Sequence, residues 1–255
     1  MTINKIRRKF GFNADRSGIM SRYLNEEKNW FEHLNNTKDF ILKNISGKNK
    51  DICLIIGSGW CLDVPVVQLS EIFKKVILAD IIHPRQIEHK FRNFPGIEFI
   101  TLDLTGILKP LLTYKKEKTE KQNLYTFLNK QNKVSFIEQI NPDFVVSVNI
   151  LSQIAYFPSE YIKRYKLASE NELLKIQEMI EKRHLDMLPE KKSILITDFF
   201  ELEYNFSGQV IKEKNRLSFS LPKEKIIKEW TWDFDLSGNY YTGNPVKFKV
   251  AALQV

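Results

Sequence analysis

The sequence predicts an α/β protein with a mostly parallel sheet, helices on both faces and a closing antiparallel hairpin. Short apolar runs alternate with segments long enough to form helical crossovers, which is typical of parallel strands. The C-terminal end differs, because two runs of alternating apolar and polar residues flank a turn rich in Gly and Asn. The chain before the first apolar run has helical spacing instead. We therefore expect three layers, a seven-stranded sheet and an N-terminal helical extension.

Composition supports one large domain with a packed core. The chain has 255 residues, of which 43% are hydrophobic and 27% charged, so wholesale disorder is excluded. No stretch approaches the ~18 consecutive apolar residues that a membrane span needs. The basic N-terminus lacks the apolar segment of a secretory signal. These features predict a cytoplasmic protein with no membrane partner.

The charge balance leaves two kinds of partner open. The formal net charge is +8, and most of the cations are lysine, which recognises phosphates and bases less specifically than arginine does. A lysine-rich solvated surface is the simpler interpretation, and nucleic-acid binding is the alternative. Cys53 and Cys61 are too few for a disulfide framework and have no partners at metal-ligand spacing. We expect reduced thiols and no metal site.

The helical extension covers residues 1–48. Trp30, Leu34, Ile41 and Ile45 recur at helical spacing within it. The apolar runs that predict parallel strands in the following domain, residues 49–255, cover residues 51–57, 75–80, 97–104, 143–149 and 192–200.

Helices are expected between these strands. After the first strand, Asp63 is a good N-cap and Pro65 fits the first turn of a helix that runs to Phe73. An insertion at residues 109–133 predicts a polar loop with a short helix.

A second insertion and the terminal hairpin complete the domain. The insertion at residues 151–190 predicts a helix broken by Pro158. A second helix there opens with the capping box Ser169-x-x-Glu172. Residues 229–235 and 246–255 predict the closing hairpin.

The strongest functional pattern joins the ends of the first two strands. Gly57-Ser58-Gly59 follows the first strand, and Asp80 ends the second. A glycine turn lets the backbone approach a ligand, and the helix after it would point free N–H groups at that ligand. A carboxylate on the neighbouring strand can accept hydrogen bonds from ribose hydroxyls. Asp103, after the third strand, adds another acid. This spacing predicts a site for an adenosine-containing cofactor, although each acid could instead form a local turn.

These residues resemble the pattern of the class I S-adenosylmethionine-dependent methyltransferases, which have a Rossmann-like fold. The resemblance spans residues 50–255: the glycine turn, Asp80, Asp103, Ser147-Val-Asn149 after the fourth strand, and the hairpin of residues 230–255. It implies S-adenosyl-L-methionine as cofactor and a small or medium-sized acceptor molecule as substrate.

By the same resemblance, Gly57 and Gly59 would face the methionine part of the cofactor, Asp80 its ribose, Asp103 its adenine, and Asn149 the methyl-transfer site. The implied cofactor-binding set is Gly57, Ser58, Gly59, Trp60, Asp80, Ile81, Asp103, Leu104 and Asn149. Two positions depart from the pattern: Ile55 replaces an acid, and Cys61 replaces a third glycine.

The acceptor side is less defined. The resemblance implies that the extension caps the substrate, and the candidate substrate residues are Trp30, His33, Gln153 and Tyr156. The strand-four sequence SVNILSQ differs from the NPPY type, which disfavours methylation of bases or glutamine amides. No general base is named.

Alternative functions also follow from the residues. An RNA-modifying methyltransferase or nucleic-acid-binding protein, and a non-catalytic relative that binds the cofactor, remain open. Leu62 in place of the third glycine disfavours a nicotinamide-dependent oxidoreductase. The absence of a G-x-S-x-G elbow disfavours a hydrolase.

Overall fold

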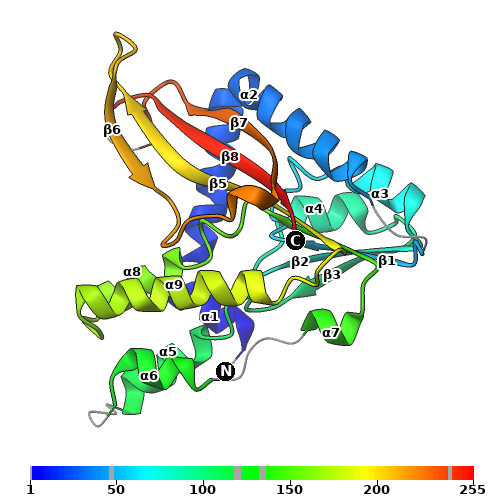
Figure 1. Ribbon diagram of the computed structural model, residues 1–255. Helices are drawn as coiled ribbons and strands as arrows, with labels where there is room; N and C mark the ends of the chain where they lie inside the picture. The colour runs from blue at the N-terminus through cyan, green and yellow to red at the C-terminus, as the bar shows by residue number, and fades with distance from the viewer. Residues whose placement is uncertain (1, 46–48, 118–121, 132–135, 241–242) are drawn as a thin grey trace.

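The computed structural model describes residues 2–45, 49–117, 122–131, 136–240 and 243–255 (Figure 1). Its described residues form one eight-stranded mixed sheet with helices on both faces. The main strand order is β3-β2-β1-β4-β5-β8-β7. The predicted α/β class with a mostly parallel sheet is confirmed.

The parallel part of the sheet consists of the strands that the apolar runs predicted. They are β1 (Ile52–Ile56), β2 (Lys75–Asp80), β3 (Ile97–Thr101), β4 (Phe144–Val148) and β5 (Ser193–Tyr204). The chain reverses its direction of sheet growth between β3 and β4, because β4 pairs with the other side of β1. The carboxyl ends of β1, β2 and β4 therefore meet at one edge, which is where ligands bind in open sheets of this type.

The C-terminal hairpin closes the sheet as predicted. β7 (Ile226–Asp235) and β8 (Val246–Gln254) are antiparallel, and β8 pairs with β5. A further strand, β6 (Val210–Asn215), pairs with the far part of β5 and was not predicted. Every residue of β6 is exposed, so its sequence lacks the apolar alternation that identifies a half-buried strand.

Helices cover both faces of the sheet. Leu54 and Ile56 of β1 pack in one core, and Cys53 and Ile55 pack in the other. The first core is covered by α1 (Ile3–Phe10), α5 (Leu108–Glu117), α6 (Leu124–Asn129), α7 (Phe136–Ile140), α8 (Tyr156–Arg164) and α9 (Glu170–Asp186). The second core is covered by α2 (Phe12–Lys43), α3 (Val66–Ile72) and α4 (Arg85–Phe91).

The N-terminal helices run from the sheet edge along one face. α2 is longer than the predicted helix and is kinked at Glu26, whose backbone is not helical (φ −115°, ψ 17°). The Glu26 carboxylate accepts hydrogen bonds from the backbone N–H groups of Leu236 (3.2 Å) and Ser237 (3.0 Å). The kink is therefore fixed to the loop after β7. Among the described residues, no helix is both long and apolar enough to cross a bilayer.

Three local predictions have different outcomes. The capping box is confirmed, because Ser169 Oγ accepts from Glu172 N at 3.3 Å. Pro158 lies in the first turn of α8 and does not break it, since a proline there removes no helical hydrogen bond. The cap prediction for Asp63 is wrong: α3 has Pro65 at its N-cap and no side-chain cap. The second insertion also contains α5 and α6, and its residues 118–121 and 132–133 lie outside the described part.

A buried carboxylate on α9 predicts a pH dependence of stability. Glu181 is 3% exposed and accepts from Ser218 N at 2.7 Å and from Ser218 Oγ at 3.3 Å. Burial raises its pKa from 4.5 to about 7, although the bonds from Ser218 act in the opposite direction. The folded chain then binds a proton that the unfolded chain has already lost, so stability falls as pH rises from about 4.5 to about 7.

We expect Glu181→Gln to remove most of this loss. The variant should gain about 1–3 kcal/mol relative to the native protein between pH 5 and pH 8. Urea unfolding at both pH values measures the difference. Glu178→Gln, at an exposed neighbour paired with Lys182, is the control and should leave the pH profile unchanged. Identical profiles for the native protein and Glu181→Gln would contradict the prediction.

Candidate functional site

The glycine turn after β1 packs directly against the end of β4. Gly57 has φ +82°, and a Cβ there would lie 2.8 Å from both Val148 O and Ile150 Cβ. Gly59 has φ +40°, with open space on the side facing Asp80. Cys61 also has positive φ (51°), so this chain keeps the left-handed backbone where the third glycine was expected. The helix begins only at Val66, after the loop of residues 57–65, so its N-terminus does not face the turn as expected.

Asp80 lies against this turn, as the spacing predicted. Gly57 N donates to Ala79 O (3.0 Å), which aligns the ends of β1 and β2. The Asp80 carboxylate accepts from Gly59 N at 2.9 Å and from Ile82 N at 3.3 Å. Its burial raises the pKa, while the backbone N–H bonds act in the opposite direction. The carboxylate and the glycine backbone therefore form one wall of a crevice.

Asp103 has a local role in the fold. Its Oδ1 accepts from Thr105 N (2.9 Å) and Thr105 Oγ1 (2.6 Å), and its Oδ2 accepts from Leu108 N (2.9 Å) at the start of α5. Burial raises the Asp103 pKa, and these hydrogen bonds oppose the rise. Any contact with an adenine amino group would share a carboxylate that already holds this turn.

Asp63 and Asn149 meet on the other side of the glycine turn. Asn149 follows β4 and has positive φ (48°), and its Nδ2 donates to Asp63 Oδ2 at 2.7 Å. Burial raises the pKa of Asp63, and the bond from Asn149 lowers it. The role of Asp63 was missed, because the sequence shows the same residue types as a helix cap.

These groups line one pocket at the carboxyl edge of the sheet. All residues of the predicted cofactor-binding set contribute to its wall, together with Cys61, Asp63 and the apolar side chains of Phe12, Ile19, Leu34, Ile154 and Phe157. The described wall contains three carboxylates, those of Asp63, Asp80 and Asp103, and no Lys, Arg or His. A chain with net charge +8 thus has an acidic pocket.

Two buried polar atoms in this wall have no protein partner. Ser58 Oγ and Asn149 Oδ1 make no hydrogen bond, and Ser58 is only 2% exposed. Buried polar atoms are nearly always paired, so these two positions suit hydrogen bonds to a ligand.

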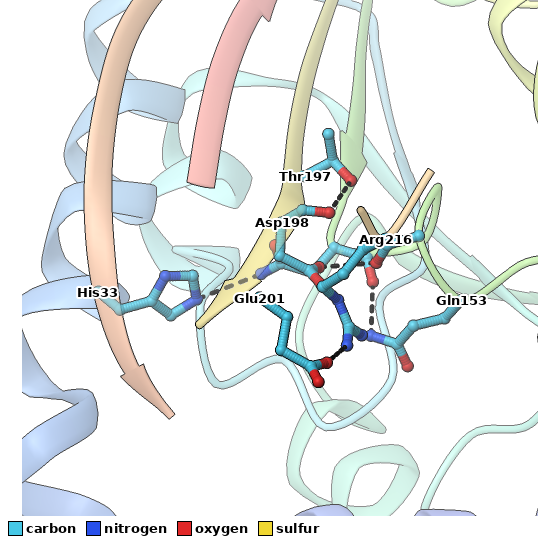
Figure 2. Close-up of polar contacts among 8 residues, drawn as sticks. His33, Gln153, Thr197, Asp198, Glu201 and Arg216 are labelled. Atoms are coloured by element: carbon cyan, nitrogen blue, oxygen red, sulfur yellow. Dashed lines mark hydrogen bonds and ion pairs between the residues drawn. The ribbon is translucent and has the colours of Figure 1, made fainter. Parts of the chain in front are cut away.

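The predicted substrate residues divide into two groups. Trp30 and Gln153 line the pocket, and His33 and Tyr156 do not. His33 is buried beneath the wall: its Nδ1 accepts from Trp230 Nε1 at 3.0 Å, its ring stacks on Trp232, and its Nε2 lies 3.3 Å from Asn149 Nδ2 (Figure 2). Burial lowers the His33 pKa to about 3, so the ring is neutral. Tyr156 is 55% exposed on α8.

An ion cluster supports the end of β5 beside the pocket. Figure 2 shows Arg216 between the carboxylates of Asp198 and Glu201. Ser152 Oγ, in the turn after β4, donates to Asp198 Oδ1 at 2.7 Å, and the neighbouring Gln153 Nε2 donates to Asn149 O at 2.9 Å. This cluster was not predicted, although Asp198 is a polar residue within an apolar strand.

A second buried histidine lies outside the pocket. His184 Nε2 and Ser147 Oγ are 2.7 Å apart, and both residues are at most 1% exposed. Burial lowers the His184 pKa to about 4. This pair joins α9 to β4 within the core.

Comparisons with known proteins give a likeness of fold. No protein-family model matches the sequence, and no curated protein matches it. Among solved structures, the N-methyltransferase NodS of Bradyrhizobium japonicum is 10% identical, with 86% of this chain and 84% of NodS covered and a TM-score of 0.39. The 1,6-didemethyltoxoflavin-N1-methyltransferase of Burkholderia thailandensis is 10% identical, with 94% and 87% covered and a TM-score of 0.40. At this identity and overlap, the likeness carries no information about ligand or activity.

Proposed function

We propose that this chain is an S-adenosyl-L-methionine-dependent methyltransferase that acts on a small or medium-sized acceptor. The observation that carries the proposal is the pocket itself. It lies where the carboxyl ends of β1, β2 and β4 meet, Asp80 is bonded to the glycine turn, and the described wall has three carboxylates and no cation.

The residues present fit this cofactor. A Cβ at Gly57 would collide with the end of β4, so the turn leaves its backbone open to a ligand. Ser58 Oγ and Asn149 Oδ1 are buried and unpaired within the wall. The acidic wall favours a sulfonium cation, whereas it would repel a ligand rich in phosphates.

Each part of the wall has a proposed role. Asp80 would accept hydrogen bonds from the ribose hydroxyls, and Ile81, Leu104 and Trp60 would pack against the adenine. Asp103 would contact the adenine amino group while it holds its own turn. When bound, the cofactor supplies a methyl group on a sulfonium, which an acceptor nucleophile takes. The chain's contribution is to orient the acceptor and exclude water, which can account for much of the rate of such a displacement.

The N-terminal helices are proposed to cap the acceptor, as the extension at residues 1–48 implies. Phe12, Ile19, Trp30 and Leu34 of α2 form one wall of the pocket. The pocket encloses about 190 Å³, below the ~300 Å³ at which small-molecule sites usually begin. Ligand entry therefore requires the cap to move, and the kink at Glu26 divides α2 into two parts for such a movement.

The pocket disfavours the competing functions. A dinucleotide needs donors or cations for its pyrophosphate, and the described wall has no cationic side chain. The same wall is unsuited to phosphates of RNA. Gln153 is the remaining polar substrate candidate in the wall, and no described histidine lines it, so an acceptor that needs no strong general base fits best.

Calorimetry with S-adenosyl-L-homocysteine tests the proposal. We expect saturable binding of one molecule per chain and no binding of NAD⁺ under the same conditions. In the complex, hydrogen exchange should slow in residues 57–63, 80–82 and 3–25, the last range reporting the cap. A folded protein that binds no S-adenosyl-L-homocysteine at millimolar concentration would contradict the function. Binding without methyl transfer to any metabolite pool would favour the non-catalytic alternative.

A further inference from the structure

The glycine turn separates the pocket into two ends. Gly59 faces Asp80 on the β2 side, and Gly57 packs against Val148 and Ile150 on the β4 side. Asp63 and Asn149 lie at the β4 side, and β1 stands between β2 and β4 in the sheet. A ligand that contacts Asp80 at one end and crosses the turn therefore reaches Asp63 and Asn149 at the other.

The β4 end carries a negative charge that the protein does not neutralise. Asp63 Oδ2 accepts only a neutral amide donor from Asn149, and no cation of the described residues lies within ion-pair distance of it. Burial of this carboxylate raises its pKa, which shows that its ionised form lacks a full set of partners. A cationic ligand group would supply the missing charge.

The neighbouring atoms are acceptors as well. Asn149 donates its Nδ2 to Asp63, so its Oδ1 remains as a buried acceptor without a partner. Ser58 Oγ, 2% exposed in the same wall, is also unpaired. A carboxylate beside unpaired oxygen atoms suits a group with several N–H donors and a positive charge, which describes a primary ammonium.

The β1 position where the resemblance expected an acid cannot supply this charge. Ile55 is fully buried in the core beneath the turn. We propose that Asp63 and Asn149 form an ammonium subsite, and that it holds the α-amino group of the cofactor's amino-acid part. This inference rests on the proposed function and extends it to a carboxylate in the loop of residues 57–65.

The test compares two ligands that share a nucleoside. S-adenosyl-L-homocysteine carries the amino acid, and 5′-methylthioadenosine has the same nucleoside and thioether without it. Asp63→Asn keeps the size of the side chain and an acceptor for Asn149. We expect it to weaken binding of S-adenosyl-L-homocysteine by about tenfold or more and to leave binding of 5′-methylthioadenosine within about twofold.

Two controls separate the possible outcomes. Asp80→Asn should weaken both ligands, because both carry the ribose. In the native protein, an analogue of S-adenosyl-L-homocysteine that lacks only the α-amino group should bind about as weakly as 5′-methylthioadenosine, which tests the subsite even if Asp63→Asn does not fold. Equal loss for both ligands in Asp63→Asn, or no loss for either, would overturn the subsite. A native protein that binds neither ligand would overturn the proposed function itself.

Discussion

Gly57→Ala is expected to destabilise the protein by about 2–5 kcal/mol, the sum of a left-handed backbone penalty and an overpacking penalty. The added Cβ would lie 2.8 Å from Val148 O and 2.8 Å from Ile150 Cβ, and φ is +82°. Neither neighbour can move freely, since one is backbone at the end of β4 and the other is a Cβ. Chemical unfolding monitored by circular dichroism measures the loss.

Gly208→Ala is the matched control for this substitution. Gly208 has nearly the same φ (+84°), but a Cβ there would meet nothing within 4 Å. It should lose only the backbone part, about 1–2 kcal/mol. The difference between the two variants isolates the packing of the glycine turn on β4. An equal loss at both positions would show that the turn has room for a side chain and is not a cradle.

The packing of this turn explains why the nucleoside end of the site could be predicted from sequence. Apolar runs identified β1 and β2, and adjacent parallel strands end at the same edge of a sheet. Gly57, Gly59 and Asp80 therefore had to lie close together once the strands were placed. The bond from Gly59 N to Asp80 Oδ2 is the local consequence of that rule.

The β4 end of the site could not be predicted in this way. Asp63 precedes a helix by three residues, and its sequence neighbourhood is equally compatible with a cap. Its actual position depends on the conformation of the loop of residues 57–65, including the left-handed backbone at Cys61, and on contact with Asn149, 86 residues away. No local pattern records such a pairing.

Long-range pairing also explains the other features that were missed. β6 is a strand because the far part of β5 extends beyond β4 and offers it an edge, although the β6 side chains are exposed. Arg216 joins Asp198 and Glu201 only after β5 and the segment following β6 come together. His33 and Trp230 are separated by 197 residues. The division into a 1–48 extension and a 49–255 domain stays a prediction.

Asp80→Asn is expected to weaken binding of S-adenosyl-L-homocysteine by about 1.5–3 kcal/mol, or about 10–100-fold, because hydrogen bonds to an ionised group are lost. The carboxylate is 8% exposed and accepts from Gly59 N, so it presents a fixed charge at the nucleoside end. Asparagine has the same shape and one remaining acceptor. Calorimetry on both proteins, after cooperative unfolding has been verified, measures the change.

Asp51→Asn provides the control at the opposite edge of the sheet. Asp51 precedes β1 and pairs with exposed Lys74, far along the strand from the glycine turn, so its substitution should leave affinity unchanged. A loss specific to Asp80 would assign the ribose contact to the end of β2, as the position of the carboxylate requires. Unchanged affinity in a folded Asp80→Asn variant would mean that Asp80 serves only to hold the turn through Gly59 and Ile82, and the nucleoside would have to bind elsewhere in the pocket.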